Sequence, residues 1–295
     1  MTDQELFTRV GIRPTPAAPS RKKGLGRDFP WVSAIGLGAI ALCCFLAPWL
    51  ATKVPAYLDL ENFTTPPCRE FLFGTDTLGR DIFSGIWYGG RVSLTIGFLA
   101  TAISTAIAIF YGAISGIGPE WLDKAMMRFT ELFLSVPGLL LVLFLQAILG
   151  EASVVSLSIV IGCTSWASMA KVIRTEVRQL RQSGYVVAAK CMGGSFLHIL
   201  GLHLAPNFIA SIMFMVVMNV RGAISTESTL SFLGMGLPLD VISWGSMLSL
   251  AEKALMSRSW WMILIPGLFL IALLLCLTEL GNYLRRQANQ KESNL

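Results

Sequence analysis

Charged residues are scarce in this sequence. Only 14% of the 295 residues are Asp, Glu, Lys or Arg, whereas a soluble domain contains about 25%. Hydrophobic residues make up 54%, which excludes an intrinsically disordered chain. Apolar runs of about 20 residues are typical of membrane-spanning helices. The composition therefore indicates a membrane-embedded protein, and in such a protein a net charge of +5 gives no reason to expect nucleic acid as a partner.

Residues that carry catalysis or bind metals are also few. The six cysteines form no CxxC pair. The two histidines, His198 and His203, lie five residues apart, whereas zinc motifs on a helix favour a spacing of four. The sequence contains neither HExxH nor GxSxG. We therefore expect no metal site, no catalytic residue and no enzymatic activity in this chain.

A nucleotide-binding motif is missing as well. No GxxxxGK[ST] run occurs, so the chain cannot cradle ATP by that motif. We expect no cofactor on this chain. Any energy for transport must then come from another chain or from an ion gradient.

Six apolar stretches predict an all-α membrane protein with about six transmembrane helices. They cover residues 31–51, 92–116, 125–150, 153–170, 206–226 and 260–282. The first stretch is longer than the apolar core of a cleaved signal peptide, so we expect it to remain as a spanning helix. Pro137 predicts a kink in the third. The transmembrane domain thus covers 31–282, between tails at 1–30 and 283–295.

The distribution of Lys and Arg predicts the orientation in the membrane. Of the 23, 16 lie in segments that share one side, namely 1–30, 117–128, 171–204 and 283–295. Because positive charge accumulates on cytoplasmic loops, we expect both termini in the cytoplasm. In this topology 52–91 is an external loop, 171–204 a cytoplasmic loop and 227–259 an external segment.

A conspicuous motif lies in the predicted external loop. It comprises Gly74, Thr75, Asp76, Gly79, Arg80 and Asp81. The two glycines allow tight turns, and the charged side chains can pair or cap a helix. The simplest interpretation is the start of a helix with local ion pairs.

The predicted cytoplasmic loop contains a second unusual segment. Tyr185 to Met192 is suited to a short helix, Gly193 and Gly194 end it, and Ser195 can cap the next helix. Ala188 and Ala189 leave the backbone approachable. From the residues alone, this helix either docks a cytoplasmic partner or is an ordinary loop helix on the bundle.

Three motifs together resemble the permease subunits of ABC importers. The pattern Tyr185-Val-x-Ala-Ala-x-x-x-Gly193, followed by His203-x-x-Pro206-Asn207, is similar to the EAA loop of these permeases. The external motif, the run Glu227 to Gly236 and the triplet Ser243-Trp244-Gly245 are similar to the second permease subunit of dipeptide, oligopeptide and nickel importers. The resemblance covers roughly residues 30–286, and three motifs in one order make it specific. The chain departs from the family pattern at Val187, where the EAA loop has its Glu, and at Phe71, where a His is common.

The resemblance implies a type I ABC importer permease fold in the cytoplasmic (inner) membrane of a bacterium. Such a chain forms half of a translocation pore. Its partners are a homologous second permease, two cytoplasmic ATPases that bind ATP and Mg, and an external solute-binding protein. The solute is a peptide or, as an alternative, nickel or another metal chelate. An ion-coupled secondary transporter is less well supported, because the two halves show no convincing inverted repeat.

The resemblance also assigns residues to coupling with the ATPase. These are Tyr185, Val187, Ala188, Ala189, Gly193 and Gly194. We expect Ala188, Ala189 and Gly193 to matter because they are small, so that a bulky residue at Gly193 uncouples transport from ATP hydrolysis. Arg221 and Glu227 are the candidates for the pore or its gate, since an ionisable group is costly in lipid.

Overall fold

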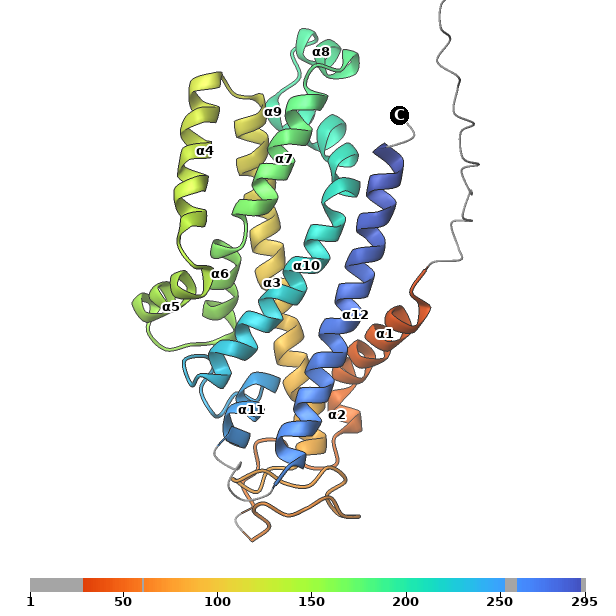
Figure 1. Cartoon of the computed structure of the whole chain (residues 1–295), viewed down its shortest axis with the longest axis vertical. Coiled ribbons are helices and arrows are strands. Elements are labelled where there is room, and N and C mark those ends of the chain that lie inside the picture. The colour runs from red at the N-terminus through yellow and green to blue at the C-terminus, as the bar shows by residue number, and fades with distance from the viewer. Residues whose placement is uncertain (1–28, 60, 253–258, 293–295) are drawn as a thin grey trace, which may run out of the picture.

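The computed structural model describes residues 29–59, 61–252 and 259–292, and helices dominate these ranges (Figure 1). The helices are α1 (Trp31–Phe45), α2 (Ala47–Leu50), α3 (Ile82–Ile117), α4 (Glu120–Ser135), α5 (Gly138–Leu149), α6 (Val154–Thr164), α7 (Ala167–Leu180), α8 (Gly184–Cys191), α9 (Phe196–Ile199), α10 (Ala205–Phe232), α11 (Trp244–Glu252) and α12 (Trp261–Glu292). One π-helical turn, Leu200–Leu204, joins α9 to α10.

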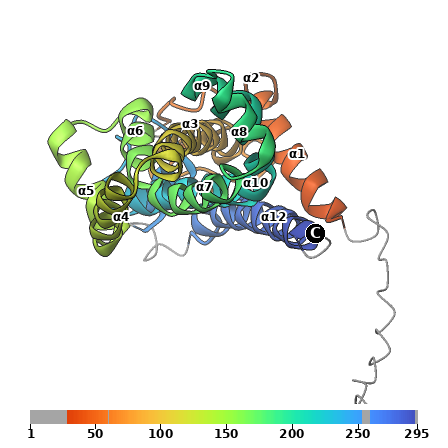
Figure 2. The same cartoon turned by 90° about the horizontal axis from the view of Figure 1, so that it is seen from above.

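Helix α3 is the centre of the bundle, surrounded by α1, α6, α7 and α10 (Figure 2). Small residues make these contacts close. A Cβ added at Gly97 would lie 2.7 Å from the Ile224 side chain of α10, and one added at Gly112 would lie 2.7 Å from the Ala170 carbonyl oxygen of α7. Such small residues at helix interfaces are typical of packing within membranes.

The helix boundaries differ from the predicted spans in several places. Helix α3 begins at Ile82, so the last ten residues of the predicted external loop are helical. Helix α7 runs to Leu180, ten residues into the predicted cytoplasmic loop. Helix α12 continues to Glu292, so much of the predicted C-terminal tail is helical. Polar residues continue α7 and α12 beyond their apolar stretches, and Gly85, Gly89 and Gly90 interrupt the apolar pattern at the start of α3, so the sequence pattern missed these extensions.

Two predicted spans are broken helices. The stretch 125–150 is divided between α4 and α5, which meet at 91°, and 153–170 between α6 and α7, which meet at 48°. Pro137 lies at the first break, where a kink was expected, because proline cannot donate the backbone bond that would continue a helix. By length and composition, α3 and α12 can each cross a membrane, and the described residues hold up to four spans if each bent pair counts as one.

The two ends of the bundle carry the segments singled out in the sequence. The loop from 51 to 81 lies at one end, and α8, α9 and the C-terminal end of α12 lie at the other (Figure 1). The loop 51–81 and helix α8 thus lie at opposite ends of the bundle, and the sides of the membrane on which the loops 52–91 and 171–204 lie stay a prediction.

Candidate functional site

Helix α8 lies at one end of the bundle and has one buried side. Val186 and Ala189 are buried and belong to a core cluster with Ile199 of α9. Tyr185 and Val187 lie on the exposed side of α8. The expectation that Ala189 is open to a partner is therefore wrong, since only 4% of this residue is exposed. Its small side chain fits α8 onto the bundle, while Ala188 is exposed.

The end of α8 follows the predicted pattern. Gly193 has a φ of +81°, and the Gly194 N–H donates to the Ala189 carbonyl oxygen at 2.9 Å, which is the closing bond of a Schellman motif. The Ser195 hydroxyl then accepts from the His198 N–H at 3.4 Å, as expected of a cap. The side chains of the motif that follows, from His203, Pro206 and Asn207, lie outside the described part of the structure.

The external motif forms a tightly bonded turn. The Thr75 hydroxyl donates to the Asn62 carbonyl oxygen at 2.6 Å and accepts from the Thr65 N–H at 2.8 Å. Asp76 Oδ1 accepts from the N–H groups of Leu78 and Arg80, each at 2.8 Å. Burial raises the pKa of the Asp76 carboxyl above its usual range, although these two N–H groups oppose the rise.

The two glycines of this motif adopt the left-handed conformation that the turn requires. Gly74 and Gly79 have φ values of +76° and +75°. At Gly79 the chain is also crowded, because an added Cβ would lie 1.8 Å from the Asp59 carbonyl oxygen. Both glycines thus have the turn-forming role predicted for them.

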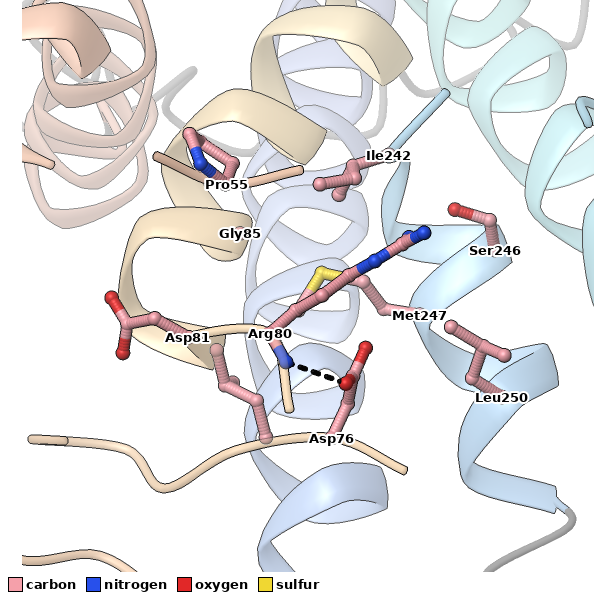
Figure 3. A pocket seen from close by; sticks show the side chains of 10 residues that line it. Pro55, Asp76, Arg80, Asp81, Gly85, Ile242, Ser246, Met247 and Leu250 are labelled. Carbon is pink, nitrogen blue, oxygen red and sulfur yellow. Dashed lines mark hydrogen bonds between the residues drawn. The ribbon is translucent and has the colours of Figure 1, made fainter. Parts of the chain in front are cut away.

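Asp81 and Arg80 attach the motif to the helices. Asp81 is the N-cap of α3, and its Oδ2 accepts from the Ser84 N–H at 3.0 Å and from the Thr52 hydroxyl at 3.0 Å. Arg80 makes no ion pair within the described ranges, and its Nη1 instead donates to the Leu239 carbonyl oxygen at 2.8 Å. Figure 3 shows Arg80 extending across a pocket of about 10 Å³ toward α11, a volume that suits a single water. The motif therefore folds the loop and positions α3 and the linker before α11.

Glu227 is the centre of a buried hydrogen-bond network. Its carboxylate is fully buried and accepts from four serine hydroxyls: Ser93 at 3.0 Å, Ser228 at 3.3 Å, Ser231 at 3.0 Å and Ser243 at 2.7 Å. Ser93 belongs to α3, Ser228 and Ser231 to α10, and Ser243 precedes α11. The network joins three helices. Sequence reasoning identified Glu227 but not its serines, although the run Glu-Ser-Thr-Leu-Ser was a usable signal.

Arg221 has the opposite surroundings. It is exposed, and no described residue forms a hydrogen bond or ion pair with it. Ser225 and Thr229 follow it at intervals of four, so the three residues share one polar stripe along α10. The structure therefore does not bring Arg221 and Glu227 together, because the first lies on the open side of α10 and the second faces the bundle.

A second polar cluster, which sequence reasoning missed, lies at the α8 end of the bundle. Asp123 of α4 accepts from the Ser115 hydroxyl of α3 at 2.6 Å, from Arg174 of α7, and from Arg178 Nη1 at 2.8 Å. One carboxylate thus links three helices. The available signal was the spacing of Arg174 and Arg178, four residues apart on one face of α7.

Comparison with known proteins gives consistent matches. A family model described as "Binding-protein-dependent transport system inner membrane component" matches residues 108–290. The dipeptide transport system permease protein DppC of Bacillus subtilis is 32% identical, over 83% of this chain and 77% of the relative. The oligopeptide transport system permease protein OppC of the same organism is 35% identical, over 85% and 80%. A putative peptide permease of Brucella suis is 36% identical, over 80% and 78%.

A solved structure supports the fold. It is an inward-facing form of the MetNI methionine ABC transporter, and the alignment covers 68% of this chain and 94% of the matched chain with a TM-score of 0.51. The sequence identity is 14%, so the likeness concerns the architecture alone.

Proposed function

Because this chain belongs to the family of binding-protein-dependent inner membrane transport components, we propose that it is a permease subunit whose importer carries peptides. The relatives named above are permeases of dipeptide, oligopeptide and peptide systems, which does not favour the nickel alternative. The family also argues against an ion-coupled secondary transporter. Members of this family are transport components, and we assign no enzymatic step to this chain.

The observation that carries the proposed coupling role is the exposed side of α8. Tyr185 and Val187 project from a short helix whose inner side packs on α9, at one end of the bundle. We assign this side to the groove of a cytoplasmic ATPase, which binds ATP and Mg itself. Closure of the ATPase pair then moves α8, and the π-helical turn passes the motion to α10 as rigid-body gating.

The proposed pore surface is the polar stripe of α10. Arg221 is exposed and has no partner in the described part of the chain, and such an arginine is costly in lipid, so it belongs on a water-filled path or against a second chain. Ser225 and Thr229 continue that stripe. A homologous second permease supplies the other half of the pore, and an external solute-binding protein delivers the peptide to the side of the loop 51–81. In this arrangement both termini are cytoplasmic, in a bacterial inner membrane.

Purification from a bacterial membrane tests the assembly. The tagged chain is extracted in a mild detergent, and co-purifying proteins are identified by mass spectrometry. We expect a second permease, one or two ATPases and a solute-binding protein. A homo-oligomer without any ATPase, reproduced in lipid nanodiscs, would contradict the proposal.

The recovered complex then tests coupling. In proteoliposomes we expect peptides to stimulate ATP hydrolysis and to enter the lumen. Val187→Arg, which places a charge on the exposed side of α8, should lower this stimulated ATPase activity at least fivefold. Arg285→Ala, at the exposed end of α12, is the matched control and should leave it unchanged.

A further inference from the structure

A cavity of about 500 Å³ lies between α5 and the linker that follows α10. One wall is the last turn of α5 and the segment after it, with Gln146 and Gly150. The other wall is the run Gly234, Met235, Gly236. This volume is typical of a ligand pocket, which ranges from about 300 to 1,000 Å³. None of the described lining residues carries a charge, so the cavity suits a neutral group.

Gln146 is the one polar side chain of α5. It lines the cavity, only 5% of it is exposed, and its Nε2 donates to the Gly150 carbonyl oxygen at 3.3 Å. Its Oε1 has no hydrogen-bond partner among the described residues. A buried acceptor without a donor destabilises a protein, because the group has lost its hydrogen bond to water and gained none in exchange. Such a group in an otherwise apolar membrane helix indicates a function that supplies the missing donor.

Glycine backbone lines much of the rest of the cavity. Gly150 and Gly234 have φ values of +83° and +73°, and a Cβ added at either would have no described atom within 4 Å. The absence of side chains at these positions leaves room for a ligand, although the Gly150 N–H donates to the Gln146 carbonyl oxygen at 3.1 Å and the Gly234 N–H to the Ser231 carbonyl oxygen at 3.0 Å. Gln146 Oε1 is thus the unsatisfied acceptor on this wall, and the N–H of a peptide main chain is a donor of the kind that it lacks.

The linker wall is held in place by groups already described. Ser231 Oγ donates to Glu227 and accepts from the Leu237 N–H at 3.3 Å. Arg80 donates to the Leu239 carbonyl oxygen. The cavity is thus bounded by a linker anchored on both sides, at the end of α10 that lies beyond the polar stripe.

We propose that this cavity is a subsite for the main chain of the transported peptide, in which Gln146 Oε1 accepts a hydrogen bond from a peptide N–H. The inference rests on the proposed function and deepens it. A site that binds the main chain does not distinguish side chains. It therefore suits a permease that passes many peptide sequences.

The first test replaces Gln146 with methionine, which has a similar length and no polar atom. In proteoliposomes with the full complex, uptake of tri- and tetra-alanine should show a KM raised about fivefold to tenfold, the value of one lost hydrogen bond. The melting temperature should be unchanged or higher, since an unsatisfied acceptor is removed. A fall in melting temperature together with a normal KM would assign Gln146 a structural role and overturn the subsite.

Peptides methylated at single main-chain nitrogens show whether this chain or the binding protein recognises a given N–H group. We expect methylation of one N–H to reduce peptide uptake more in the original complex than in the Gln146→Met complex, since only the original chain can bind that N–H. An equal penalty in both proteins would place discrimination in the binding protein and overturn the subsite. If the original complex transports no peptide at all, the proposed function fails, which is a distinct result.

Thiol protection locates the bound peptide. In a background without native cysteines, Ala147→Cys lines the cavity and Ile148→Cys, also exposed, does not. Tetra-alanine should slow maleimide labelling at position 147 at least threefold and leave position 148 unaffected. Protection at position 147 by the second permease alone, without peptide, would show that a protein segment fills the cavity and would overturn the proposal.

Discussion

Glu227 connects distant parts of the chain through its hydrogen bonds. One buried carboxylate accepts four serine hydroxyls from α3, α10 and the segment before α11. In Glu227→Ala these hydroxyls lose their acceptor and a cavity remains. Since each buried unsatisfied group costs about 1–3 kcal/mol, we expect a loss of about 3 kcal/mol or more. The measurement is the melting temperature of the purified chain in detergent.

Two variants make the Glu227 test specific. Glu227→Gln retains one oxygen acceptor, and serine hydroxyls can rotate to accept from its amide, so we expect a smaller fall in melting temperature. Thr229→Ala lies two residues away on the same helix and is exposed, so it should leave the melting temperature unchanged. Equal melting temperatures of Glu227→Ala and the original chain would show that the network contributes nothing to stability.

The end of α8 depends on one backbone conformation. An added Cβ at Gly193 would meet no described atom within 4 Å, but its φ of +81° disfavours any other residue, above all a β-branched one. The structure thus gives Gly193 a conformational role, and the expectation that it also matters through its small size stays a prediction. Gly193→Val should distort the end of α8 and lower transport per ATP hydrolysed several-fold, measured in proteoliposomes with the full complex.

Gly193→Asn is the matched control for α8, because asparagine tolerates the left-handed conformation. We expect it to retain most of the transport per ATP. If asparagine and valine impair coupling equally, the size of the residue at position 193 decides coupling, as expected for a surface that touches the ATPase.

The external loop depends on Gly79 in the same way. An alanine Cβ would approach the Asp59 carbonyl oxygen to 1.8 Å at a positive φ, so Gly79→Ala must open the turn. We expect faster cleavage of the loop 51–81 by a protease added to the external side, by about tenfold. Gly38→Ala in α1, where an added Cβ meets no described atom within 4 Å, should not change the cleavage rate. Unchanged cleavage of Gly79→Ala would contradict the role of this turn.

Local sequence signals predicted the caps, turns and breaks of helices well, but they did not predict the contacts between helices. The cap at Asp81, the turn at Gly79 and the break at Pro137 each depend on neighbouring residues, and all three were predictable. The Glu227 network was not, because Ser93 lies 134 residues away and only the packing of α3 on α10 brings it close. The inward orientation of Ala189 escaped prediction for the same reason, since α9 decides which side of α8 is buried.

At the scale of the whole molecule, α10 connects the two ends of the bundle. At one end it continues the π-helical turn beyond α8 and α9, and at the other it carries Glu227 and the linker wall of the cavity. The Asp123 cluster ties α3, α4 and α7 together at the α8 end. The rigid-body gating that we propose thus has a continuous path of packed helices from the α8 end to the far end of the bundle.

Two cysteines allow the orientation of the whole chain in the membrane to be tested. Cys68 is exposed in the loop 51–81, and Cys191 is exposed at the end of α8. A variant that keeps only one of these cysteines reports on one side of the membrane. A membrane-impermeant maleimide should label the Cys68 variant in intact spheroplasts, and the Cys191 variant only after permeabilisation. The reverse pattern would place α8 outside the cell, where no cytoplasmic ATPase could reach it, and would overturn both the orientation and the coupling role.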